Sequence, residues 1–376
     1  MSGSEADNIR RAIGRKQKDR LDKAMPSILE GYCSKSSNPR PEAEEEAKEF
    51  LQIIEDSASY QFGYNHSIAY CMLGYYCAYF RHYHPFEFIT AFLNNAANED
   101  DIKNGTAYAS KVGIKVTMPK YGVSKSDYFF DKNKGVIAKG LSSVKFIGAN
   151  VADEVYKASA IVPQHFVEAL MQLEGTTLNT RQVDVLIKID FFSDYGNQRE
   201  LLRIAELFYG IFKSGHAKQI SKEKIANTPL DPIVSKYSVG NTKSGAISKN
   251  YTILDIESIL IESEEAILNA EMNDLDDKTK MKNFEDIMGY AGYVSNNEDD
   301  RRKLYVVDIF PLFRKKDNKQ FGYSVITRSI GSGKESRFTI FNTVFNQNPI
   351  TKGDMVYCKS FSRDGQYFTM TSYDKI

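Results

Sequence analysis

The sequence predicts a multidomain α+β protein, in which a mainly helical region is followed by a small all-β barrel. Its 376 residues exceed what one ordinary hydrophobic core organises, so two or three domains are expected. Apolar residues recur at helical spacing over 42–57 and 66–82, whereas residues 287–376 hold short β-rich runs separated by turn signals. The change of pattern near residue 287 therefore separates two structural classes.

The helical region opens with a predicted helix over 5–32, whose first turns are crowded with arginine and lysine. Asn38-Pro39-Arg40-Pro41 then breaks the chain, and Pro41 suits the first turn of a new helix because its missing N–H would have no partner there. Further helices are predicted over 42–57, 66–82, 86–93 and 96–111. A strand over 114–118 and a hairpin of 128–130 with 135–138 follow.

Five apolar runs at the end of the chain predict strands, because signals such as Lys316-Asp317-Asn318 and Lys352-Gly353-Asp354 place turns between them. The runs are 304–313, 321–330, 336–345, 354–361 and 366–373. Five strands at this spacing favour a small closed barrel, with an OB-fold as the leading candidate. The second and third strands of such a barrel would form a groove for single-stranded nucleic acid.

The segment before the barrel has two compositions. Residues 213–250 are rich in Lys, Ser and Gly, and 235–249 is predicted to be an exposed linker. Residues 254–286 are acidic and follow a helical pattern.

Composition sets broad limits on the class of protein. Lys plus Arg and Asp plus Glu both number 49, so net charge does not itself indicate a nucleic-acid partner. The four cysteines are scattered and form no metal-binding spacing, as expected of reduced thiols in the cytoplasm. The polar N-terminus lacks the features of a signal peptide, and no apolar run is long enough for a membrane span. A cytoplasmic protein without a membrane partner is expected.

Two sequence blocks carry a family resemblance. Residues 5–16 read Glu-Ala-Asp-Asn-Ile-Arg-Arg-Ala-Ile-Gly-Arg-Lys, and residues 60–70 read Tyr-Gln-Phe-Gly-Tyr-Asn-His-Ser-Ile-Ala-Tyr. In content, order and separation these blocks resemble the fingers segment of the bacterial replicative DNA polymerase III alpha subunit, a C-family polymerase. The resemblance continues through Tyr75, Ala78-Tyr79 and Pro85-Phe86-Glu87-Phe88.

Later motifs extend the resemblance to about residue 202. Gly113-Ile114-Lys115-Val116 and Gly140-Leu141-Ser142-Ser143-Val144-Lys145 look like the approach to a helix-hairpin-helix, and 178–199 looks like a second such unit. The barrel fits the family by position and class. The resemblance implies four parts: fingers over 1–95, a helix-hairpin-helix DNA-binding region over 96–212, a basic linker with an acidic helical segment over 213–286, and an OB-fold-like barrel over 287–376.

The resemblance also implies residue roles at the fingers. Guanidinium groups bind phosphate in a bidentate manner, and a helix that begins with imidazole and hydroxyl groups suits an anion. The expected nucleotide-binding residues are Arg10, Arg11, Arg15, Lys16, His66 and Ser67. The alternative is a solvated basic helix, together with a serine that only caps its own helix.

Expected DNA contacts lie in the hairpins and the barrel. Backbone N–H groups of a hairpin can hold a DNA phosphate without reading sequence, while aromatic and basic side chains can follow a single strand. The candidates are Lys139, Lys145, Ile147, Gly148, Ala149, Asn150, Arg199, Tyr323, Arg328, Arg337 and Phe338. The alternatives are a second hairpin that only packs, and phenylalanines that form the barrel core.

Three departures from the family pattern matter. Gly63-Tyr64-Asn65 stands where the family has Asn-Lys-Ser, and Phe146-Ile147-Gly148 lacks the first glycine of the usual hairpin. No cluster resembling Pro-Asp-x-Asp-x-Asp-Phe, which would mark the catalytic palm, occurs in the sequence. The chain alone is therefore not expected to polymerise DNA.

These departures lead to competing hypotheses. The first is a part of a split replicative polymerase, for instance a phage-encoded one, that binds primer-template and single-stranded DNA while a palm-bearing chain completes the enzyme. Mg²⁺ and dNTP would then bind in the complete polymerase, and a sliding clamp and other replisome proteins would be further partners. The alternatives are a stand-alone DNA-binding module and a replisome adaptor without catalysis.

Overall fold

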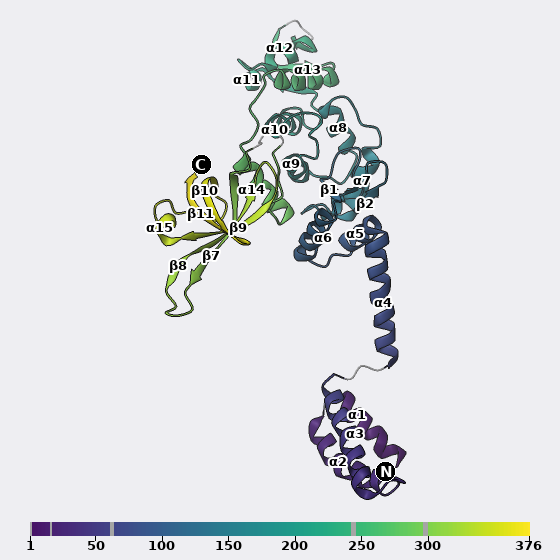
Figure 1. The fold of residues 1–376 in the computed structure, drawn as a ribbon. Helices are drawn as coiled ribbons and strands as arrows, with labels where there is room; N and C mark the ends of the chain where they lie inside the picture. The colour runs from purple at the N-terminus through teal and green to yellow at the C-terminus, as the bar shows by residue number, and fades with distance from the viewer. Residues whose placement is uncertain (1, 16, 61–63, 242–245, 296–299) are drawn as a thin grey trace. The chain divides into compact units, whose positions relative to one another are not determined.

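The computed structural model describes residues 2–15, 17–60, 64–241, 246–295 and 300–376 (Figure 1). Lys16, one of the expected nucleotide-binding residues, lies outside these ranges. The chain divides into two compact units, Met1–Pro85 and Phe86–Ile376, which are described separately. Within the described part of the chain, every helix is too short or too polar to cross a bilayer.

The first unit is helical. Its helices are α1 (Gly3–Gly14), α2 (Lys18–Cys33), α3 (Arg40–Tyr60) and α4 (Tyr64–Tyr83). Small and aliphatic residues bury the contacts of the first three helices, among them Ala12, Leu21, Ala43 and Ala47. The prediction of one helix over 5–32 is wrong, because α1 ends at Gly14 and a new helix begins at Lys18. Glycine is a poor helix former, and the chain turns there.

Helix α4 has an unusual surface. None of its residues is buried, although it carries many tyrosines and aliphatic residues. Tyr64, Ile68, Tyr75 and Tyr79 recur at helical spacing on one side and are each at least 42% exposed. Tyrosines at helical spacing usually line a buried core, whereas these tyrosines are exposed. A helix that is apolar over so much of its circumference normally packs against another surface.

The second unit begins with a small sheet covered by helices. Its elements are α5 (Pro85–Asn94), α6 (Glu99–Lys111), β1 (Lys115–Thr117), β2 (Phe129–Asp131) and β3 (Val136–Ala138). The strand order is β1-β3-β2, with β1 parallel and β2 antiparallel to β3. Ile89, Leu93 and Ile137 lie in its core. The predicted strand and hairpin are confirmed.

Short helices then form the main core of this unit. They are η1 (Leu141–Ser143), α7 (Ala149–Ala158), α8 (Phe166–Leu173), α9 (Thr180–Lys188), α10 (Gln198–Glu206), η2 (Leu207–Ile211), α13 (Ile256–Leu268) and α14 (Asp277–Met288). Fully buried phenylalanines, including Phe166, Phe192 and Phe208, fill the space between them. The buried carboxylate of Glu264 accepts from the backbone N–H groups of Phe166 and Val167 at 2.8 and 2.7 Å, so α13 caps α8.

The Lys-, Ser- and Gly-rich region over 213–250 is folded where the structure describes it, and residues 242–245 of the predicted linker over 235–249 lie outside the described residues. The region contains β4 (Gln219–Ser221), α11 (Lys222–Ile225), α12 (Leu230–Lys236), β5 (Ser238–Asn241) and β6 (Ile247–Ile253), with sheet order β4-β6-β5. The lysines that suggested a solvated linker have partners. Lys222 donates to the Gly240 carbonyl at 2.8 Å and lies over the Tyr251 ring, and Lys236 pairs with Glu262. Tyr251 and Ile253 pack against the main core, which composition did not indicate.

A closed five-stranded barrel ends the chain, as predicted. Its elements are β7 (Lys303–Phe313), β8 (Gln320–Ser329), β9 (Glu335–Phe341), α15 (Asn342–Phe345), β10 (Met355–Asp364) and β11 (Tyr367–Lys375). The strand order is β10-β11-β9-β8-β7, and β10 pairs with β7 to close the barrel. Only β9 and β11 are parallel among the strand pairs of the barrel. This arrangement is OB-like.

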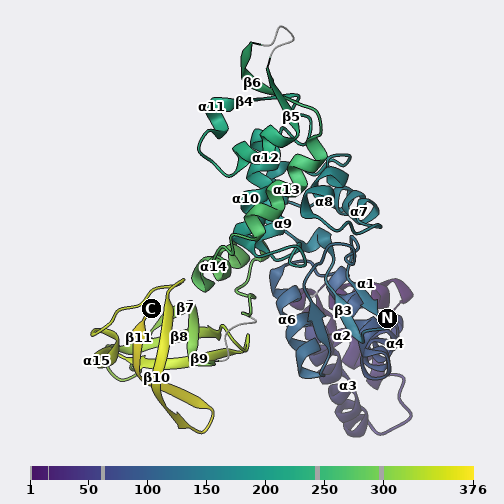
Figure 2. The same ribbon diagram turned by 90° about the horizontal axis from the view of Figure 1, so that it is seen from above.

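The barrel contacts helix α14, which precedes it in the chain (Figure 2). The Tyr305 hydroxyl donates to Glu285 at 2.7 Å, and Lys352 pairs with the same carboxylate at 3.0 Å. Tyr305 and Met355 belong to the main helical core rather than to the barrel's own core. One side of the barrel is therefore buried, and this limits the surface left for a ligand.

Candidate nucleic-acid interface

The loop that enters α7 exposes backbone donors. After η1 the chain passes through Phe146, and Gly148 is the N-cap of α7 without a side-chain hydrogen bond to the helix. Gly148, Ala149 and Asn150 are exposed. Ile147 is 4% exposed and its N–H donates to the Val144 carbonyl at 3.0 Å, so this residue anchors the loop and its N–H is not available to DNA. The open start of α7 is a local source of positive potential.

Phe146 explains how the loop tolerates the missing glycine. Its φ is +71°, the left-handed region that glycine adopts most readily. The Gln182 side chain of α9 donates to the Phe146 carbonyl at 2.7 Å and holds this conformation. Lys145 is exposed beside it and donates to the Asp286 carbonyl at 3.4 Å. The turn between η1 and α7 therefore forms with phenylalanine at this position.

The second hairpin, between α9 and α10, has a different chemistry at its helix start. Asn197 caps α10: its side chain accepts from the Glu200 N–H at 3.0 Å, and Glu200 accepts from the Asn197 N–H at 3.0 Å. Gln198 is buried and donates to Asp190, whose pKa is raised by burial. Arg199, the DNA-binding residue predicted in this hairpin, is exposed. The reciprocal cap thus provides acceptors for the Asn197 and Glu200 N–H groups at the start of α10.

Lys139 is not presented to DNA. It is 3% exposed, its ammonium group donates to the Tyr290 hydroxyl at 3.2 Å, and it lies 4.9 Å from the centroid of that ring. The sequence-based assignment of this lysine to a DNA contact is therefore corrected. A lysine surrounded by aromatic residues packs through its aliphatic stem, and its sequence neighbours carry no signal of that.

In the barrel, strand register decides which aromatic residues are accessible. Phe338 is 7% exposed and serves the barrel interior, and Tyr323 stacks on Phe345 with ring centroids 3.9 Å apart. Phe341 of β9 and Phe310 of β7 are each 45% exposed. The expectation for Phe338 is corrected, because alternate residues of a strand face opposite sides. The expectation for Tyr323, which is half-buried, stays a prediction.

The basic residues of the barrel also divide. Arg337 is exposed, as a groove residue requires. Arg328 is half-buried beside Tyr290 and Glu335, burial lowers its pKa, and its Nε lacks a hydrogen-bond partner in the described part of the chain. It lines a different pocket from the one beside Phe341. Beside Phe341, which the sequence also places in the expected groove of the barrel, is a pocket of about 460 Å³. It is lined by Arg314, Gln320, Phe321, Phe341, Asn342 and Thr343.

The basic residues of α1 are exposed but partly neutralised. Arg10 and Arg11 both contact Asp7, each at 2.8 Å, and the hydrogen bond from Arg10 lowers the pKa of this carboxylate. Arg15 is exposed. Two guanidinium groups on one carboxylate leave a net positive charge, and exposed ion pairs give way readily to a competing anion.

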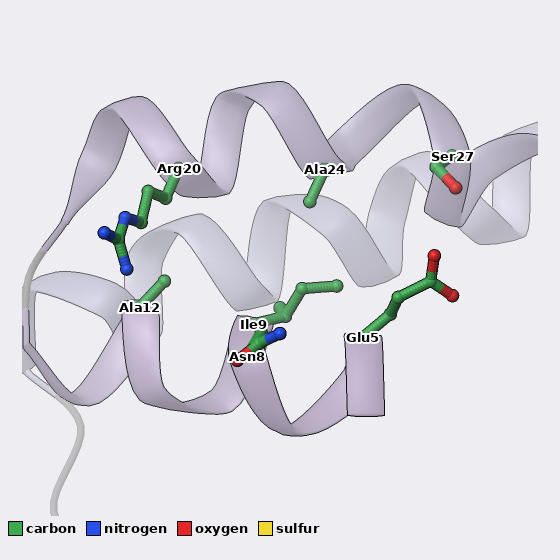
Figure 3. Close-up of a pocket in the computed structure, with 7 residues that line it drawn as sticks. All are labelled: Glu5, Asn8, Ile9, Ala12, Arg20, Ala24 and Ser27. Carbon is green, nitrogen blue, oxygen red and sulfur yellow. The ribbon is translucent and has the colours of Figure 1, made fainter. Parts of the chain in front are cut away.

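Helices α1 and α2 also enclose a groove of about 260 Å³ (Figure 3). Glu5 lies toward one end and Arg20 toward the other, with Ile9 between them. The groove is lined by Glu5, Asn8, Ile9, Ala12, Arg20, Ala24 and Ser27. Its small residues reflect close packing of two helices, and sequence reasoning did not single it out.

His66 and Ser67 lie in the first turns of α4. The His66 ring is 4.4 Å from that of Tyr70, and Ser67 is half-buried. Their expected contact with nucleotide stays a prediction. Among the described residues, no group of three histidine, cysteine, aspartate or glutamate side chains is placed to hold a metal ion.

Comparison with known proteins yields one recurring similarity. No family model matches the chain. DNA polymerase III subunit alpha of Bacillus subtilis is 28% identical over 200 residues, which is 53% of this chain and 17% of that protein. The subunits of Aquifex aeolicus and Thermus aquaticus are 27% and 28% identical over 61% and 54% of this chain, and the match spans 19% and 16% of their lengths. About half of the chain thus resembles roughly a fifth or less of these relatives.

Proposed function

We propose that this chain is a DNA-binding part of a polymerase III alpha-like replicative polymerase, whose catalytic palm is supplied by another chain. The observation that carries the proposal is the open start of α7 at Gly148, next to the exposed Lys145. Similarity to polymerase III alpha over about half of the chain supports the same reading. Primer-template DNA is the proposed partner.

The α7 hairpin suits a phosphate by its chemistry. Exposed N–H groups at a helix start attract an anion, and a neighbouring lysine adds charge without demanding a particular base. Contacts of this kind position a duplex and depend strongly on salt. Duplex binding without sequence preference is what a replicative polymerase requires of such a module.

The first unit would contribute to the nucleotide site. A triphosphate can replace Asp7 as the partner of Arg10 and Arg11, because the pair is exposed and phosphate accepts in a bidentate manner. Metal chemistry is assigned to the palm-bearing chain, because this sequence lacks the aspartate cluster that marks the palm. The exposed aromatic surface of α4 is a suitable contact for that partner.

The barrel would hold the single strand. Phe310 and Phe341 offer exposed rings, and Arg337 adds positive charge. A sliding clamp and other replisome proteins would be partners of the assembled polymerase.

The decisive experiment is primer extension on a primed template. The chain is assayed alone and mixed with a palm-bearing polypeptide from the same genome. Extension only in the mixture, lost with the double substitution Arg10→Ala and Arg11→Ala, would establish the split polymerase. Lys132→Ala, which removes a surface charge from the other unit, is a control that should retain extension.

Two other outcomes would support the alternative functions. Salt-sensitive DNA binding without extension in any mixture would leave a stand-alone DNA-binding module. Absence of both activities, with retained binding to replisome proteins, would leave an adaptor without catalysis.

A further inference from the structure

Phe146 is an unusual residue for its position. It has φ +71° at the tip of a hairpin, where a side chain is disfavoured, and yet half of its surface is exposed to solvent. An apolar ring that is neither buried nor favoured by the backbone gains little from folding. Strained residues of this kind gather at binding sites.

The ring is not needed to shape the loop. The Phe146 carbonyl accepts from Gln182 at 2.7 Å, and the next residue, Ile147, supplies the buried anchor. Both contacts would be available to any residue at position 146. These backbone contacts therefore do not require a phenyl group at this position.

Two cations flank the ring. The Arg181 guanidinium carbon lies 4.7 Å from the ring centroid, and the Lys145 ammonium nitrogen lies 5.7 Å from it. Arg181 is exposed and forms no ion pair with a carboxylate in the described part of the chain. An apolar peptide would gain nothing from this charge, whereas DNA combines flat bases with phosphates.

The spacing along the chain suits one nucleotide and its neighbour. Phe146 is two residues before Gly148, where the exposed start of α7 would hold a phosphate. A base inside a duplex is stacked on both faces and cannot reach the ring without being extruded. An unpaired base at a junction already has an accessible face.

We infer that Phe146, flanked by Arg181, is a stacking site for an unpaired nucleobase of DNA beside the hairpin. This inference rests on the proposed function, because it needs DNA at the α7 hairpin. It assigns the hairpin a preference for a primer-template junction over a continuous duplex.

The test uses the full chain and a primer-template that carries 2-aminopurine as the first unpaired base. Stacking on Phe146 should quench its fluorescence. Phe146→Gly should abolish the quenching and weaken junction binding about fivefold or more, since stacking on one aromatic ring contributes that much. Binding to continuous duplex should change less than twofold. Phe146→Trp should restore both quenching and affinity.

Controls separate stacking from folding. Glycine favours φ +71°, so Phe146→Gly should unfold at the wild-type denaturant concentration or above. Tyr156→Ala changes another exposed aromatic residue, at the other end of α7, and should leave quenching intact.

The outcomes distinguish this inference from the proposed function. Salt-sensitive duplex binding, with quenching unchanged by Phe146→Gly or not restored by Phe146→Trp, would overturn only the stacking site. A wild-type chain that binds neither duplex nor junction would overturn both.

Discussion

The two hairpins of the second unit present opposite helix starts. Helix α7 begins at Gly148 without a side-chain cap, whereas α10 begins at Asn197 with a reciprocal cap through Glu200. Around α7 the surface is exposed and basic; around α10 the side chains of Gln198 and Glu200 are buried. Under the proposed function, the uncapped start of α7 leaves backbone donors for a ligand, whereas the side-chain cap of α10 stabilises that helix.

The largest change in DNA affinity is expected when a charged residue caps α7. Gly148→Asp should lower duplex affinity about ten- to hundredfold, because the carboxylate would accept the α7 donors and repel phosphate. No atom lies within 4 Å of a Cβ added there, so folding should be preserved or slightly improved. Fluorescence anisotropy at several salt concentrations measures the effect. Gly148→Ser, which adds a cap without charge, should lower duplex affinity less. Equal duplex affinity of Gly148→Asp and wild type would show that the start of α7 does not contact DNA.

Removing the cap of α10 should act on stability instead. Asn197→Ala loses the bond from the Glu200 N–H and the one its amide donates to the Met272 carbonyl at 2.8 Å. A decrease of about 1–2 kcal/mol in the free energy of unfolding is expected, measured by urea denaturation. Duplex affinity should remain at the wild-type value under folding conditions. A large loss of affinity with unchanged stability would show that this hairpin also binds DNA.

In the barrel, an exposed and a buried phenylalanine of β9 test whether exposed residues bind DNA while buried residues stabilise the fold. Phe341→Ala should weaken binding of a single-stranded oligonucleotide about fivefold and leave stability nearly unchanged, because the ring is 45% exposed. Phe338→Ala should do the reverse and destabilise the barrel by about 3 kcal/mol or more. Filter binding and thermal unfolding distinguish the two variants. If Phe341→Ala binds as wild type does, the strand does not cross β9.

The smallest effect concerns a charged cap on α14. Hydrogen bonds from the Thr279 hydroxyl and backbone N–H lower the pKa of Asp276 from 3.8. Its stabilising contribution is complete above pH 3.8 and is lost as pH falls through the lower folded-state pKa. Solvent screening limits the contribution to about 1 kcal/mol. Unfolding scans below pH 4 should show a steeper loss for wild type than for Asp276→Asn; parallel curves would contradict this.

The sequence predicted elements whose signals are local. The five barrel strands, the β1 strand and the β2–β3 hairpin formed close to where period-two patterns and turn residues placed them. The third predicted barrel strand, 336–345, is an exception, because β9 ends at Phe341 and the rest of that run forms α15. The break at Gly14 was missed because the helical pattern continues on both sides of it. The sheet around β6 was missed because Lys, Ser and Gly describe a linker equally well.

What the sequence by itself determined is the mainly helical region, the barrel and the resemblance to polymerase III alpha, because strand and helix periods and family motifs are written in consecutive residues. Which side chains face a ligand was decided only in three dimensions. Lys139 is buried under Tyr290, Phe338 faces the barrel core, and the helices α7 and α10 differ in their caps. Accessibility depends on what distant segments cover, and register and packing set it together.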